Sequence, residues 1–204
     1  MVPTLEPFLA LYAGLLSAHS PLLRFTRQML VVAPFGVVWI ATGAVAWVLL
    51  VLSEDDAVAR GLLVAIAGAY QLSPLARACL GRCRSPMAFL MRYGAMQRTP
   101  GDAVALGSRY ALICVGCCAA LWIALVGAGA MGLAWMAALA LLVLVEKWHA
   151  SGEVFARVAG AALLLLALPT AFGADIWTER AGLIALLAVG TAAVVTVRSR
   201  TVTA

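Results

Sequence analysis

The sequence predicts an all-α fold, a polytopic bundle of about seven membrane-spanning helices, or six if the first is interfacial. Of its 204 residues, 65% are hydrophobic and 11% are charged, and apolar content on that scale exceeds what a single soluble core can bury. A spanning helix needs about 20 mostly apolar residues, and several stretches near that length are separated by short polar breaks. We therefore expect one integral membrane domain over residues 1–204.

The apolar stretches define the predicted spans. The first is short, with Pro7 near its start and His19 near its end, so it could instead lie along the membrane interface. Gly127 to Gly129 leave almost no loop between the fourth and fifth spans, which predicts a tight antiparallel hairpin rich in small residues. The spans are expected at about 5–22, 29–51, 58–79, 104–127, 130–146, 155–172 and 181–197.

Arginine and lysine positions predict the orientation, because cytoplasmic loops carry the basic excess. If the spans are right, most basic residues fall on one side, while acidic groups such as Glu54 to Asp56 fall on the other. We expect the 80–103 loop and the C-terminus to be cytoplasmic, and the N-terminus to lie outside if the first helix spans. The net charge of +5 then reflects topology and attraction to anionic lipid, not nucleic acid. The N-terminus lacks the pattern of a cleaved secretory signal, so its first segment is expected to be retained.

The cysteines form two groups on predicted helix faces, within a cysteine-bearing core at about residues 69–150. Residues three or four apart share a face, and at about 100° per residue the second group flanks a single direction. Tyr110 shares that direction and is a further candidate metal ligand. Gly116 points roughly the opposite way and leaves a flat surface for another helix. The cysteines are Cys79, Cys83, Cys114, Cys117 and Cys118.

This clustering indicates a soft-metal site, because thiolates select Cu(I), zinc or iron–sulfur clusters over hard cations. The spacing is not that of a zinc finger, and a disulfide is disfavoured in the reducing cytoplasm. Arg77, Arg82 and Arg84 would favour the ionised thiolates of Cys79 and Cys83. The alternative is that each cysteine is a small buried hydrophobe, and that the arginines follow from topology alone.

The cysteines are predicted to lie at different depths in the membrane, which leaves two arrangements of the thiols open. Cys79 and Cys83 end their span, whereas Cys114 lies about ten residues inside the next, or about 15 Å along a helix. Either the loop folds back so that all five thiols converge, or an outer pair receives a metal and an inner trio accepts it. The intervening SPMAFLMRYGAM predicts a short interfacial helix beginning near Pro86. Its Met87 and Met91 are further candidate ligands, or membrane-facing residues.

Glu146 is another candidate. Folding the predicted hairpin brings position 146 level with about position 112, near the depth of Tyr110 and Cys114. An acid there could neutralise an arginine, ligate a metal or relay a proton. Alternatively, Glu146 and Lys147 simply mark the cytoplasmic end of their span.

The segments YQLSPLARACLGRCRSP, YALICVGCC and GLAWMAALALLVLVEKW together resemble a family of bacterial multi-pass membrane proteins, predicted to bind metals and sometimes labelled copper chaperones. The resemblance covers about residues 69–160. It implies a place in the bacterial inner membrane and a metal-binding role for the five cysteines, with Glu146 as a further candidate. The N-terminal third departs from the family, whose members tend to have an early methionine-rich helix. LALYAGLLSAHSPLLRF has no methionine, and His19 could substitute as a ligand or serve as a surface or capping residue.

We therefore expect a membrane-embedded protein that binds a soft metal, Cu(I) favoured over zinc, and passes it to or from another membrane or metal-handling protein. The alternative is a non-catalytic accessory or structural subunit of a membrane complex. A transporter lacks support, because no internal repeat is detectable. A thiol–disulfide redox protein would place its Cys114 to Cys117 pair inside a span, where partner access is poor. No hydrolytic triad or nucleotide-binding motif is present, so no enzyme and no nucleic-acid partner are expected.

Overall fold

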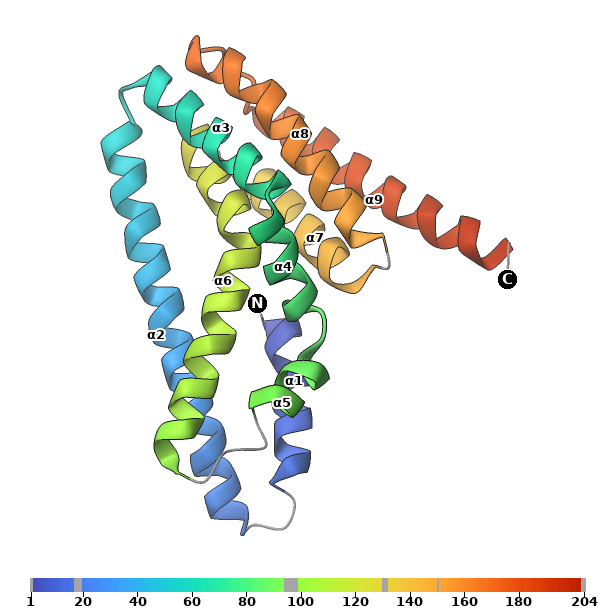
Figure 1. Ribbon diagram of the computed structural model, residues 1–204. Coiled ribbons are helices and arrows are strands. Elements are labelled where there is room, and N and C mark those ends of the chain that lie inside the picture. The colour runs from blue at the N-terminus through green and yellow to red at the C-terminus, as the bar shows by residue number, and fades with distance from the viewer. Residues whose placement is uncertain (1, 17–19, 94–98, 130–131, 150, 203–204) are drawn as a thin grey trace.

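The computed structural model describes residues 2–16, 20–93, 99–129, 132–149 and 151–202, and every regular element within them is an α-helix (Figure 1). The predicted all-α class is confirmed. The helices are α1 (Val2–Leu15), α2 (Pro21–Ser53), α3 (Ala57–Leu72), α4 (Pro74–Cys83), α5 (Pro86–Tyr93), α6 (Pro100–Ala128), α7 (Leu133–Trp148), α8 (Gly152–Ala171) and α9 (Glu179–Val202).

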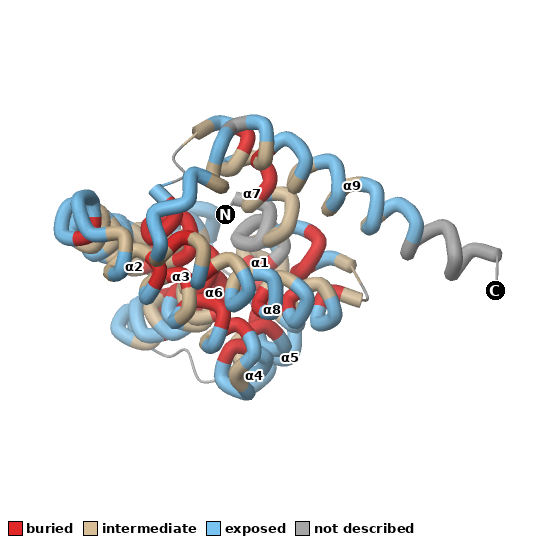
Figure 2. The backbone as a smooth tube through the Cα atoms, turned by 90° about the horizontal axis from the view of Figure 1, so that it is seen from above, coloured by how far each residue is buried: buried red, intermediate tan, exposed pale blue. Residues whose placement is uncertain are grey.

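Helix α6 lies at the centre of the bundle and packs against α2, α3 and α4 (Figure 1). Helix α8 covers the other side of α3, and α7 packs mainly against α9. Viewed from above, buried residues gather around α6 and α3, whereas α9 extends away from the bundle (Figure 2). Many residues of α6, such as Ala111, Cys114 and Ala120, are therefore completely buried.

Three helices, α2, α6 and α8, are long and apolar enough to cross a membrane, and α3 with α4 would make a fourth if the bent pair is one span. The expected count of about seven is not confirmed. Helices α1 and α7 have only 14 and 16 residues, fewer than the number that a membrane span needs. The apolar part of α9, Arg180–Val195, is also shorter than a span. His19 lies outside the described residues.

The predicted span at 58–79 is not one straight helix, because the chain bends by 65° between α3 and α4. Pro74 has no backbone N–H and disfavours helical backbone at Ser73, which is extended at φ −69° and ψ 154°. The Ser73 hydroxyl then accepts a hydrogen bond from the backbone N–H of Ala76 at 3.1 Å and starts α4. The bend brings α4 against α6.

The predicted tight hairpin of α6 and α7 is also wrong. Helix α6 ends at Gly129, whose φ of +62° suits glycine, and Arg60 of α3 donates to the carbonyls of Gly127 and Ala128 at 3.0 and 2.6 Å. Helix α7 then leaves α6 and contacts it at few positions. The turn at Gly129 therefore ends α6, but α7 does not pack along α6 as an antiparallel partner. The short helix expected from Pro86 is present as α5.

The closest approach of α2 to α6 depends on Gly107. A Cβ at this position would lie 2.2 Å from the carbonyl oxygen of Val31, which belongs to the backbone of α2. Backbone atoms cannot rotate away as a flexible side chain can, so only glycine fits without moving one helix.

We predict that Gly107→Ala lowers the free energy of unfolding by about 1–3 kcal/mol, the usual cost of overpacking. Gly43→Ala is the matched control, because a Cβ on this α2 glycine meets nothing within 4 Å, and it should leave stability unchanged or raise it. Thermal unfolding of the purified protein measures both. Equal midpoints for the two variants would contradict the close α2–α6 contact.

Candidate metal centre

Four of the five cysteines form one buried cluster where α4 meets α6. The Sγ atoms of Cys83 and Cys114 are 3.4 Å apart, and those of Cys117 and Cys118 are 3.6 Å apart. Cys83 also hydrogen-bonds Cys117, which joins the two pairs. All four side chains are at most 5% exposed. We call these residues the thiol cluster.

The helices explain this convergence. Cys114, Cys117 and Cys118 follow each other at helical spacing on α6 and present one group of thiols. Cys83 is the last residue of α4, and the bend at Ser73 lets that end of the helix reach α6. Thiols that are 31 residues apart in the chain thereby come into contact.

Cys79 lies apart from the thiol cluster. It is half-buried and packs against α6 at Gly116, where a Cβ would lie 3.0 Å from its Sγ. The hydroxyl of Tyr70 donates to the Gly116 carbonyl at 2.7 Å and also interacts with Cys79. Gly116 therefore accommodates another helix, and Cys79 is the most accessible of the five thiols.

A buried lysine provides the positive charge beside the thiol cluster. Lys147 of α7 is only 6% exposed, and its ammonium group hydrogen-bonds Cys83 and Cys118. It also acts electrostatically on Cys114 and Cys117. From its sequence position alone, Lys147 is expected to mark the cytoplasmic end of a span. Its adjacency to Glu146 after a long apolar run was the one available signal.

Two of the three predicted arginines donate hydrogen bonds to backbone carbonyls. The guanidinium of Arg84 donates to the carbonyl of His149 at 2.7 Å, and that of Arg82 donates to Ala78 in its own helix at 3.3 Å. Arg82 does act electrostatically on Cys79. Arg77 faces a small cavity next to Glu146.

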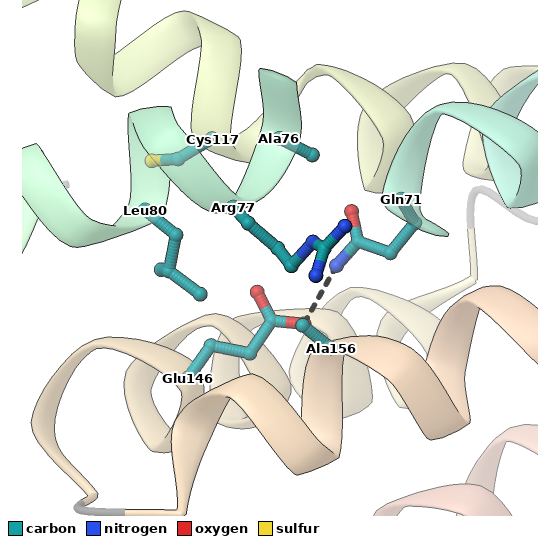
Figure 3. A pocket seen from close by; sticks show the side chains of 7 residues that line it. All are labelled: Gln71, Ala76, Arg77, Leu80, Cys117, Glu146 and Ala156. Atoms are coloured by element: carbon teal, nitrogen blue, oxygen red, sulfur yellow. Dashed lines mark hydrogen bonds between the residues drawn. The ribbon is translucent and has the colours of Figure 1, made fainter. Parts of the chain in front are cut away.

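This cavity has a volume of about 10 Å³, close to the smallest that holds a water molecule. Glu146, 2% exposed, accepts a hydrogen bond from Gln71 Nε2 at 2.9 Å. Figure 3 shows Gln71 and Arg77 extending toward Glu146, with Cys117 at the edge of the same cavity. Gln71 Oε1 has no hydrogen-bond partner among the described residues. The carboxylate thus lies beside the thiol cluster, in a polar pocket of its own.

The remaining candidate metal ligands differ in how exposed their side chains are. Tyr110 is buried, interacts with Cys114, and stacks on Phe8 with ring centroids 4.1 Å apart. Met87 and Met91 are 54% and 74% exposed on α5. Tyr110 therefore forms part of the wall of the thiol cluster, and the two methionines do not.

Comparison with known proteins gives one family. A family model described as PpoB2, copper chaperone, matches residues 1–170. The chain belongs to this copper chaperone family. No curated protein and no solved structure matches it.

The thiol separations can be compared with the separations of sulfur ligands around a metal ion. With metal–sulfur bonds of about 2.3 Å, tetrahedral ligands lie about 3.8 Å apart and linear ones about 4.6 Å apart. The separations of 3.4 and 3.6 Å are nearer the tetrahedral value. Within the described residues, no group of three or more His, Cys, Asp or Glu side chains is arranged to hold a metal ion.

We predict that a maleimide modifies Cys79 before any cysteine of the thiol cluster, because the other four thiols are buried. In the native protein, mass spectrometry should detect a first adduct on Cys79. Cys79→Ser should abolish this fast reaction, whereas the control Cys118→Ser should retain it. A fast reaction that survives in Cys79→Ser would contradict the assigned burial.

Proposed function

We propose that the protein is a membrane-embedded copper chaperone that holds Cu(I) in the thiol cluster and passes it to or from a metal-handling partner protein. The observation that carries this proposal is the convergence of four buried thiols from two helices. Thiolates are the ligands that soft Cu(I) prefers. Membership of the copper chaperone family supports copper as the cargo.

The apolar outer surface supports membrane placement. Helix α2 has 33 residues, and its side chains Val37, Ile40 and Trp47 are 64%, 75% and 68% exposed. Surfaces of this kind are stable in hydrocarbon and unfavourable in water. We place the chain in the bacterial inner membrane, with the 80–103 loop and the C-terminus cytoplasmic, where partners present reduced thiols.

Lys147 gives the site the charge that Cu(I) binding requires. Two thiolates and one Cu(I) carry a net charge of −1, and an uncompensated charge is costly in a buried site. The Lys147 ammonium already hydrogen-bonds Cys83 and Cys118, so it can balance that charge. Charge compensation of this kind favours the thiolate ligands before and after the metal binds.

Cys79 is suited to receive the ion first. It is the most accessible of the five thiols and lies one helical turn before Cys83 on α4. In this proposal a partner delivers Cu(I) to Cys79, and the thiol cluster then retains it. Transfer by ligand exchange needs no chemical transformation, so the proposed role is not enzymatic.

We predict that changing Cys83, Cys114, Cys117 and Cys118 together to serine abolishes copper retention in protein purified under reducing conditions. The matched control, Cys79→Ser, should keep the same copper content and load more slowly. Elemental analysis for copper, zinc and iron measures content, and stopped-flow mixing with Cu(I) measures loading. Equal copper in the fourfold variant and the unchanged protein would overturn the proposal.

We predict that Lys147→Met weakens Cu(I) binding about 10–100-fold, the usual effect of removing a group that supports metal ligands. Lys147→Arg should bind within a few-fold of the unchanged protein, because it keeps the charge. Competition with a chromogenic Cu(I) chelator measures each affinity. The charge argument fails if Lys147→Met binds copper as tightly as the unchanged protein.

A further inference from the structure

The ends of two helices meet beside the thiol cluster. Helix α4 ends at Cys83, and α7 ends one residue after Lys147. The Lys147 ammonium hydrogen-bonds Cys83, although the two helices contact each other at few positions. A lysine side chain is flexible and loses rotamer freedom when it is held in one place. Its contact with the thiols therefore depends on what holds the ends of α4 and α7 together.

Arg84 joins these two helix ends. Its backbone N–H donates to the carbonyl of Leu80 at 3.0 Å and ends α4. Its guanidinium reaches the other helix, where Nη2 donates to the carbonyl of His149 at 2.7 Å. His149 is the residue that caps the end of α7. We call this hydrogen bond the helix-end contact, because it connects the residue after Cys83 to a residue two positions after Lys147.

The accepting carbonyl is held in place by the turn between α7 and α8. It also accepts the backbone N–H of Gly152 at 3.0 Å, and the Nδ1 atom of His149 accepts the backbone N–H of Ser151 at 3.1 Å. A Cβ at Gly152 would overlap the carbonyl of Glu146, so the start of α8 packs directly on the backbone of α7. Carbonyls at a helix C-terminus carry partial negative charge and favour a cation. The guanidinium therefore meets an acceptor of suitable charge in a defined position.

We propose that Arg84 is a positioning residue that holds the Lys147 ammonium against the thiol cluster and so strengthens Cu(I) binding. The inference rests on the proposed function, in which Lys147 balances the charge of the copper-bound thiolates. The helix-end contact has a charged donor and a distance of 2.7 Å, both typical of the stronger hydrogen bonds in proteins. Without it, fewer contacts hold α7 beside α4, and Lys147 meets the thiols for a smaller fraction of the time.

This role differs from the direct effect expected from the sequence, in which the charge of Arg84 itself favours the thiolate of Cys83. A direct effect of that charge does not require Lys147. An effect that acts through the position of α7 does require it. The two roles therefore give different results when Arg84 and Lys147 are changed together.

We predict that Arg84→Gln weakens Cu(I) binding about 10-fold, at the low end of the usual effect of a group that supports metal ligands. The matched control is Arg82→Gln, which removes the same charge from an exposed side chain that donates to Ala78 in its own helix. It should bind within about twofold of the unchanged protein, as surface substitutions usually do. Competition with a chromogenic Cu(I) chelator measures each affinity. Arg84 is only partly buried, so Arg84→Gln should fold, which the thermal unfolding midpoint checks.

The decisive comparison repeats Arg84→Gln in the Lys147→Met background. There it should change the affinity by less than about twofold, because the group that it positions is gone. A loss of about 10-fold in both backgrounds would show that Arg84 acts independently of Lys147 and would overturn the inference. Equal affinities of Arg84→Gln and Arg82→Gln would also overturn it.

Maleimide labelling of the copper-free protein tests the helix-end contact without the metal. The side chain of Cys83 is 5% exposed, and loss of the contact should free the end of α4. Cys83 should therefore react several-fold faster in Arg84→Gln than in Arg82→Gln. Equal rates would overturn the inference and leave the proposed function intact. Absence of copper from the unchanged protein would overturn the proposed function, and with it the effect of Arg84 on copper.

Discussion

Helix α6 sets the arrangement of the other helices, because α2, α3 and α4 all pack against it. Glycines allow this close packing. Gly107 accepts the backbone of α2, Gly116 accepts Cys79 of α4, and Gly127 accepts the backbone of α3. Because the same helix carries Cys114, Cys117 and Cys118, the packing that stabilises the bundle also encloses three of its five thiols. The metal-binding proposal therefore depends on how closely the helices approach α6.

Charge imposes a second constraint on the enclosed site. Buried ionisable groups are costly unless they are paired, yet Glu146 and Lys147 are adjacent and both nearly inaccessible. Each has its own partners: Glu146 accepts from Gln71, and Lys147 faces the thiol cluster. The two adjacent side chains of α7 therefore have different surroundings: Glu146 faces Gln71, and Lys147 faces the thiol cluster.

The sequence predicts the helical class and the two cysteine groups because composition and spacing are local properties. It could not place Cys83 relative to Cys114 of α6, because that depends on the 65° bend at Ser73, although Ser-Pro was a visible signal. The hairpin prediction was wrong because the turn at Gly129 specifies how α6 ends and does not specify which helix α7 packs against. From the sequence, the arginines next to Cys79 and Cys83 were the expected positive charges beside the thiolates, because they are close in the chain. Lys147, 29 residues after Cys118, required the tertiary structure.

X-ray absorption at the copper K-edge of the Cu(I)-loaded protein tests the central claim most directly, because it reads the ligand atoms themselves. The account predicts a first shell made only of sulfur atoms at about 2.3 Å, because the thiol cluster supplies only cysteine ligands. A first shell that contains nitrogen or oxygen atoms would contradict the assignment of copper to the thiol cluster.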